Sequence, residues 1–200
     1  MKKKWLLLFL LFFPLTAEKG YTYYESGRVK SVFELSNKTK NGVCKKYFPS
    51  GKLKMVSSFK KGCKDGPEIE YYQTGTLKIK RKVKYKNGLK TGIEKKYYPT
   101  GQIYSTAVYK AGKLEGRKQV YDTAGNLAAV IPYKRGKKNG LKIIYYKNGT
   151  IKKEAPLLKG KINGIVRVYY KNGNIKKLLF YRMGKLVNKV DKKINDIDPQ

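Results

Sequence analysis

Apolar and polar side chains alternate after a glycine that recurs along the chain. The glycines are separated by steps of 24, 24, 26, 24, 24 and 24 residues, and they are Gly27, Gly51, Gly75, Gly101, Gly125, Gly149 and Gly173. The residue two positions after each glycine is branched and apolar: Val29, Leu53, Leu77, Ile103, Leu127, Ile151 or Ile175. The residue between the two is polar in every copy. This period of two predicts a β-strand with one buried face after each glycine.

Each glycine closes a turn between two strand-like runs. The phrase before it is typically Tyr-Tyr-x-x-Gly, as in residues 145–149 and 169–173. Short aromatic and β-branched runs on both sides of a glycine-containing turn predict a β-hairpin. Between hairpins, a Gly-x-x-x-Gly pattern such as residues 62–66 predicts a connecting turn. The third copy has two additional residues, which keep every side chain on its own face because the strand period is two.

A repeat of 24 to 26 residues is typical of an array of small units that bury their apolar faces against one another. Seven copies predict seven hairpins, about fourteen strands, in an all-β, elongated, single antiparallel meander. No segment shows sustained helical periodicity. We expect this array to occupy residues 18–188 and a polar C-terminal tail to occupy residues 189–200.

The first 17 residues form a separate unit. Three lysines at positions 2–4 precede an apolar run over residues 5–13, and the small residue Ala17 follows. This order is typical of a secretory signal peptide, and the apolar run is about half of the ~20 residues that span a bilayer. We expect cleavage after residue 17, no remaining transmembrane span, and export to the periplasm, the cell envelope or the extracellular space. An uncleaved membrane anchor is the alternative.

The two tyrosines of each hairpin phrase must face opposite ways because they are adjacent in a strand. One row should therefore face the core. The other row would form a half-exposed stripe flanked by lysines, able to stack on a ligand while ammonium groups hold its anionic groups. The candidate residues of this ligand stripe are Tyr72, Tyr98, Tyr146 and Tyr170. The alternative is that both rows are cross-strand packing ladders.

Cys44 and Cys63 are the only cysteines of the chain. Both are expected near the same end of the second hairpin, and export would permit a disulfide between them. The alternative is a pair of free thiols that act as small hydrophobic side chains.

The chain contains no histidine, which removes the usual general base and the commonest metal ligand. Two cysteines without histidine do not complete a four-ligand zinc site. Glu68 and Glu70 form the closest acidic pair on one strand face, and we expect them to be an exposed ladder rather than a catalytic dyad. The sequence therefore predicts no catalytic residue, no metal site and no cofactor, and a protein that is not an enzyme.

Positive charge dominates the composition. The chain has 47 Lys and Arg residues against 13 Asp and Glu residues, a formal net charge of +34. Between Thr123 and Val190, Glu154 is the one acidic residue, against seventeen Lys and Arg residues. Such an excess favours anionic partners. Because export removes the protein from cytoplasmic nucleic acid, we expect a protein partner or an anionic lipid or polymer instead.

The recurrent Tyr-Tyr-x-x-Gly-x-Leu/Ile-Lys, followed by Tyr-Lys-x-Gly-Lys-x-x-Gly, resembles the bacterial variant of the MORN (membrane occupation and recognition nexus) repeat. The resemblance covers about residues 21–188. It implies an elongated antiparallel sheet of successive hairpins that serves as an interaction or lipid-associating module, and some bacterial relatives carry antitoxin labels. It brings no catalytic residue to this chain.

These observations lead to one expected function and two alternatives. We expect an exported, non-enzymatic binding or scaffold module for an anionic envelope component or a protein partner. The first alternative is an antitoxin or immunity-type protein that neutralises a toxin by covering its surface. The second is a structural spacer or adhesin.

Overall fold

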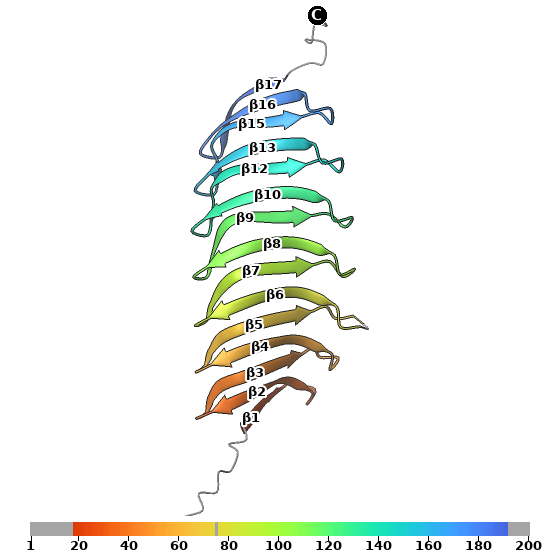
Figure 1. The fold of residues 1–200 in the computed structure, drawn as a ribbon, viewed down its shortest axis with the longest axis vertical. Helices are drawn as coiled ribbons and strands as arrows, with labels where there is room; N and C mark the ends of the chain where they lie inside the picture. Colours follow the sequence, from red (N-terminus) through yellow and green to blue (C-terminus); the bar gives the residue numbers. More distant parts are fainter. Residues whose placement is uncertain (1–17, 75, 192–200) are drawn as a thin grey trace, which may run out of the picture.

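The protein is a single antiparallel sheet of 17 strands, as seen in a computed structural model that describes residues 18–74 and 76–191 (Figure 1). The strands are β1 (Glu18–Tyr23), β2 (Val29–Ser36), β3 (Thr39–Tyr47), β4 (Leu53–Lys60), β5 (Cys63–Tyr71), β6 (Ile79–Lys86), β7 (Leu89–Tyr97), β8 (Ile103–Lys110), β9 (Lys113–Tyr121), β10 (Leu127–Lys134), β11 (Lys137–Lys138), β12 (Gly140–Tyr145), β13 (Ile151–Leu158), β14 (Lys161–Ile162), β15 (Gly164–Tyr169), β16 (Ile175–Arg182) and β17 (Lys185–Asp191). Neighbours in the chain are neighbours in the sheet, so β1 and β17 lie at its opposite ends. The predicted all-β antiparallel meander is confirmed.

Two interrupted strands and one additional strand account for the difference from the fourteen strands expected. β11 and β12 both pair with β10, and β14 and β15 both pair with β13. The interruptions lie opposite prolines: the N–H of Asn139 donates to the carbonyl of Pro132, and that of Asn163 to Pro156, each at 3.0 Å. Because proline has no N–H to donate in return, the ladder lapses there. β17 continues the sheet to Asp191, beyond residue 188, where we expected the array to end.

The connecting turns are shorter than the glycine pattern predicted. β4 ends at Lys60 and β5 begins at Cys63, so the turn consists of Lys61 and Gly62. Their φ angles of 50° and 81° are both positive, as in the type I′ turn that matches the twist of a hairpin. The second glycine of the pattern, Gly66, lies inside β5 with φ 106°, where a Cβ atom would stand 3.0 Å from the Cβ of Ser58. It therefore serves a close strand contact and not the turn.

The buried side chains of the described residues all lie on one face of the sheet. In the register, Cys44 is opposite Ser57, and Ser57 is opposite Glu68. The full set is Ser31, Cys44, Ser57, Glu68, Val83, Glu94, Ser105, Ala107, Ala155, Leu157 and Val166. We call this face the inner face and the opposite one the outer face. Many of its buried side chains are small, and the strands are arched (Figure 1), so this face is shielded without a second layer.

The two-residue insertion of the third repeat lies in its hairpin turn. Tyr71 pairs with Ile79, as Tyr97 pairs with Ile103 in the next repeat. Ile79 therefore holds the position that the sequence assigned to Leu77, and Leu77 is 65% exposed. The assignment of Leu77 to the apolar face is wrong because the count from Gly75 ignored where the insertion falls.

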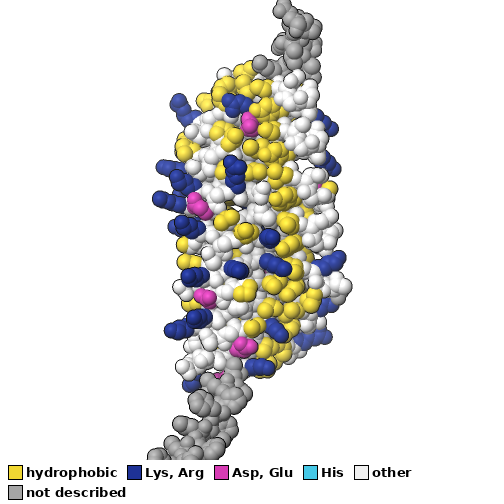
Figure 2. Space-filling model, in the orientation of Figure 1, with side chains coloured by type: hydrophobic (Ala, Val, Ile, Leu, Met, Phe, Trp, Pro, Cys, Tyr) yellow, Lys and Arg dark blue, Asp and Glu magenta, His cyan; other side chains and the backbone are white. Residues whose placement is uncertain are grey.

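Figure 2 shows one face of the molecule, where hydrophobic side chains form a band along the length of the sheet. Lys and Arg side chains are scattered over this face and gather at its borders, with a few acidic side chains among them. Hydrophobic side chains of the outer face, such as Val43, Ile93 and Leu141, are exposed. The sheet thus presents both an apolar and a cationic surface to its surroundings.

The expected signal peptide, residues 1–17, lies outside the described residues, and so does most of the expected tail, residues 192–200. Within the described part of the chain, no helix is long and apolar enough to cross a membrane.

Candidate functional site

The candidate ligand stripe lies along the hairpin turns, where its tyrosines connect one repeat to the next. The hydroxyl groups of Tyr72, Tyr98 and Tyr146 donate to the backbone carbonyl oxygens of Tyr97, Tyr121 and Tyr169, at 2.7, 2.8 and 2.8 Å. Lysine ammonium groups lie over the rings of Tyr72, Tyr146 and Tyr170, at 6.0, 5.5 and 5.3 Å from the ring centroids. These distances are within the range of a cation–π interaction. The stripe therefore has a clear structural task in joining the repeats.

Neither row of tyrosines belongs to the buried core. Apart from Tyr23, which is exposed, the first and second tyrosines of the hairpin phrases are half-buried. In the first row, the hydroxyl of Tyr169 donates to the carboxylate of Glu154 on the outer face at 2.7 Å. The expectation that one row faces the core is wrong, because the core of this single layer consists mainly of small residues on the inner face.

The two cysteines are free thiols in the structure. Cys44 lies in β3 on the inner face and is 1% exposed, whereas Cys63 is the exposed first residue of β5. Side chains alternate between faces along a strand, and Glu68 of β5 is on the inner face, so Cys63 is on the outer face. The candidate disulfide is therefore not formed: the two side chains are on opposite sides of the sheet.

A cluster of paired charges occupies the inner face in the third and fourth repeats. Glu68 is 1% exposed, and its carboxylate accepts hydrogen bonds from Lys64 and from Nη2 of Arg81, the latter at 2.6 Å. Nε of Arg81 donates to Glu70 at 3.1 Å. In the fourth repeat, Nζ of Lys90 donates to Glu94 at 2.9 Å. The expected exposed ladder of Glu68 and Glu70 is thus wrong, because the curvature of the sheet encloses these carboxylates.

The pairing shifts the ionisation of these groups. Burial disfavours the charged form of Glu70, but hydrogen bonds from Lys80 and Arg81 outweigh it and hold the pKa of that carboxyl below its ordinary value. Burial likewise opposes the charge of Lys90, yet its hydrogen bond to Glu94 raises the pKa of the ammonium group. The cluster is therefore a neutralised, structural arrangement of acids and bases.

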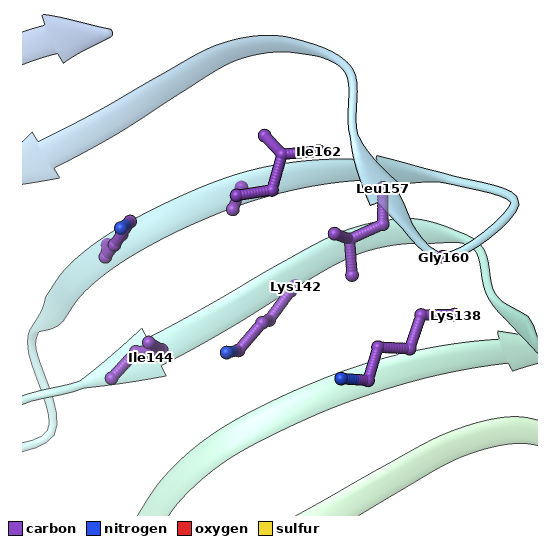
Figure 3. Close-up of a pocket in the computed structure, with 8 residues that line it drawn as sticks. Lys138, Lys142, Ile144, Leu157, Gly160 and Ile162 are labelled. Carbon is purple, nitrogen blue, oxygen red and sulfur yellow. The ribbon is translucent and has the colours of Figure 1, made fainter. Parts of the chain in front are cut away.

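A different arrangement occupies the inner face in the sixth repeat. A pocket of about 200 Å³ is lined by Lys138, Lys142 and Lys153 and by the apolar side chains of Ile144, Leu157 and Ile162 (Figure 3). The side chains of Lys138 and Lys142 run in the same direction in this view. Burial, together with the charges of Lys138 and Lys153, lowers the pKa of Lys142. We call this feature the lysine pocket.

The lysine pocket holds the same sheet positions as the charge cluster of the third repeat. Glu70 pairs with Arg81 across β5 and β6, and Ile144 pairs with Lys153 across β12 and β13. Glu68 comes two positions before Glu70, as Lys142 does before Ile144. Lys64 comes four positions before Glu68, as Lys138 does before Lys142. The third repeat therefore combines two cations with two carboxylates, whereas the sixth combines three cations with an isoleucine.

The ion pairs formed among the described residues do not include Lys138, Lys142 or Lys153. Lys118, which holds the corresponding position in the fifth repeat, also has a lowered pKa, caused by burial and by the charges of Lys96 and Lys138. Positive charge is thus concentrated on the inner face from β9 to β13. Sequence reasoning missed this site, although comparing the same position between repeats shows Glu68 and Glu94 giving way to Lys118 and Lys142.

The described side chains of the inner face supply paired charges, a group of lysines and apolar contacts. Over residues 18–74 and 76–191, no group of three His, Cys, Asp or Glu side chains is placed to hold a metal ion. The carboxylates of Glu68, Glu70 and Glu94 are engaged by Arg81, Lys64 and Lys90. What the geometry offers is a group of ammonium groups beside apolar side chains, a combination that attracts anions.

Comparison with known proteins identifies the repeats. A family model described as "MORN repeat variant" matches residues 40–61, 64–87, 90–111, 138–158 and 162–183. No curated protein matches the chain. The matched segments coincide with five of the hairpins, all except β1–β2 and β9–β10, and together make up more than half of the sequence. The chain therefore belongs to the MORN repeat variant family.

Proposed function

We propose that this protein is an exported, non-enzymatic binding module whose basic sheet holds an anionic component of the cell envelope. MORN repeats are used as binding or scaffold modules, which supports the general class of the function. The observation that carries the choice of partner is the charge: a formal net charge of +34 on an open sheet, with seventeen Lys and Arg residues and one acid between Thr123 and Val190. Attraction to an anionic surface is the direct consequence of such an excess.

The single-layer architecture supports a surface-binding role. An array of hairpins has no second layer to enclose an active site, and each repeat contacts only its neighbours. Its outer face exposes apolar side chains such as Ile93 and Leu141 beside lysines. A surface of this kind can lie along an extended partner. Residues 1–17 support export because they have the order of a signal peptide.

The test is binding of the full chain to anionic and neutral surfaces at several ionic strengths. We expect the protein to sediment with vesicles of phosphatidylglycerol and phosphatidylcholine, and to bind an anionic polymer, at low salt. Both interactions should weaken as salt increases, because exposed charges are screened over ~8 Å at physiological ionic strength. Vesicles of phosphatidylcholine alone are the control. Equal binding to both vesicles, or none to either vesicle or to the polymer at low salt, would refute the proposal.

A further inference from the structure

The lysine pocket has a charge that the described part of the fold does not balance. In the third repeat, the carboxylates of Glu68 and Glu70 neutralise Lys64 and Arg81 within the inner face. In the sixth repeat, Lys138 and Lys153 keep the two cationic positions, but Lys142 takes the place of Glu68. The third and fourth repeats each pair a lysine with a glutamate four positions later. The sixth repeat instead has lysines at both positions, Lys138 and Lys142. Like charges in neighbouring positions repel each other, so the exchange costs stability in the free protein.

Lys138 is exposed, but the partial burial of the other two lysines makes the imbalance more costly. Lys142 and Lys153 are half-buried, and Ala155 and Leu157 beside them are buried. A partly desolvated ammonium group without a counter-charge is unfavourable. The lowered pKa of Lys142 reflects this burial and the repulsion by Lys138 and Lys153. An anion in the pocket would supply the missing counter-charge and would offset the repulsion among the three lysines.

We propose that the lysine pocket binds a compact, multiply charged phosphate group, whose oxygens take the position that the carboxylate of Glu68 holds in the third repeat. This inference rests on the proposed function and names its site and ligand class. Three ammonium groups exceed the single charge of a carboxylate, and phosphate oxygens accept several hydrogen bonds from lysines at once. The pocket volume of about 200 Å³ is below the ~300–1,000 Å³ of sites for drug-sized ligands, so a small group fits.

The apolar side chains of the pocket define how the phosphate is presented. Ile144, Leu157 and Ile162 lie beside the lysines (Figure 3). They offer contact to a carbon chain attached to the phosphate and strengthen the charge interactions by excluding water. The same phosphate chemistry occurs in a soluble phosphate ester and in the headgroup of phosphatidic acid. The test below separates these two sources.

The decisive variant is Lys142→Glu, because the fold already uses glutamate at this position in the third and fourth repeats. The introduced carboxylate should pair with Lys138, as Glu68 pairs with Lys64, so we expect an unchanged or higher melting temperature. Lys171→Glu is the matched control: it makes the same charge change at an exposed residue of the seventh hairpin turn, outside the pocket. Both full-length variants would be compared with the unmodified protein by calorimetric titration with pyrophosphate at low salt.

We expect Lys142→Glu to weaken pyrophosphate binding at least about tenfold, because a hydrogen bond to a charged group contributes that much affinity. The control, Lys171→Glu, should change pyrophosphate binding less than about twofold. Phosphatidylcholine vesicles with and without phosphatidic acid form the second arm. Lys142-dependent binding of pyrophosphate without vesicle binding identifies a soluble phosphate ester, and Lys142-dependent vesicle binding identifies the lipid headgroup. Either result supports the pocket.

Two results would overturn the inference. One is an equal loss of pyrophosphate binding in both variants, which would attribute it to net charge. The other is no binding of pyrophosphate or phosphatidic acid by the unmodified protein. If the protein still binds phosphatidylglycerol vesicles or the anionic polymer, the pocket is wrong and the proposed function stands. If it binds pyrophosphate through Lys142 but neither the vesicles nor the polymer, the pocket stands and the proposed envelope role is wrong.

Discussion

Single side chains stabilise this array by bonding across the boundary between repeats. The N–H of Met183, in the last connecting turn, donates to Oδ1 of Asn163 at 3.0 Å, and the N–H of Asn87 donates to Oδ2 of Asp65 at 3.1 Å. Asn41, Glu115 and Asn139 accept the corresponding bonds from Lys61, Arg135 and Lys159. Each acceptor satisfies a backbone donor in a turn that has positive φ. Consecutive turns are therefore held in register by side chains that the sequence pattern did not single out.

Replacing Asn163 by alanine should lower the free energy of unfolding by about 0.5–1.5 kcal/mol, the usual net contribution of one hydrogen bond. The loss arises because the N–H of Met183 loses its acceptor. Asn163→Asp is the control, since Asp65 shows that a carboxylate accepts the same bond. Urea denaturation of both variants measures the effect. If the aspartate variant loses as much stability as the alanine variant, the hydrogen bond is not the cause.

The hairpin glycine of the sixth repeat is required by its backbone conformation. Gly149 has φ 84°, and no atom lies within 4 Å of the position that a Cβ would take. Gly149→Val should therefore lower stability through backbone strain alone, by about 1–3 kcal/mol. Lys147→Val, in the same exposed turn, is the comparison because its φ is not positive. Thermal melts that agree within error for the two variants would contradict this explanation.

The strands show which parts of the fold can be predicted from sequence. The alternation after each glycine predicts strands that begin at residues such as Leu53 and Ile103, and β4 and β8 begin there, although the register shifts beside both residues. Proline has a local effect, and the interruptions opposite Pro132 and Pro156 follow from its missing N–H. The burial of Glu68 was not predicted, because it depends on the curvature of the whole sheet. The lysine pocket was missed for the same reason: its lysines matter only once the inner face is known to be enclosed.

The tyrosine stripe connects the hairpins as structural elements. Tyr146→Phe keeps the ring beneath Lys152 but removes the hydroxyl that donates to the carbonyl of Tyr169. We expect a loss of about 0.5–1.5 kcal/mol in the free energy of unfolding, with no change in vesicle binding. Tyr146→Ser also removes the ring, so it should lose more stability. A tyrosine-to-phenylalanine change that weakens binding without affecting stability would instead favour the ligand-stripe interpretation.

The charge cluster between β5 and β7 should make stability dependent on acidic pH. Because the pKa of Glu70 is lowered in the folded state, its contribution is fully present above the ordinary value of 4.5 and is lost as the pH falls through the lower folded value. Glu70→Gln should therefore reduce the fall in stability below that pH. Glu25→Gln, at an exposed turn position, is the control. Denaturation curves measured from neutral to acidic pH test this. Equal pH profiles for the two variants would show that the cluster does not contribute.

The array as a whole distributes its charge unequally between its two halves. The described acids of the inner face belong to β1, β5 and β7, in the N-terminal half, apart from Asp191 in β17, which pairs with Lys177 and Lys189. The inner face from β9 to β13 carries Lys118, Lys142 and Lys153. A linear array keeps these halves apart, because each repeat contacts only its neighbours. An anionic surface should therefore be held mainly by the C-terminal half.

Two triple variants test this polarity at equal net charge. One replaces the exposed residues Lys45, Lys60 and Lys86 by glutamate, and the other replaces Lys134, Lys161 and Lys185. Both change the charge equally, yet the second should weaken binding to phosphatidylglycerol vesicles at least about threefold more, because local potential and not total charge governs the attraction. The difference should shrink at high salt, where screening shortens to ~3 Å at 1 M. Equal losses at low salt would mean that the whole sheet acts as one uniformly charged surface, and the polarity along the repeats would then have no part in binding.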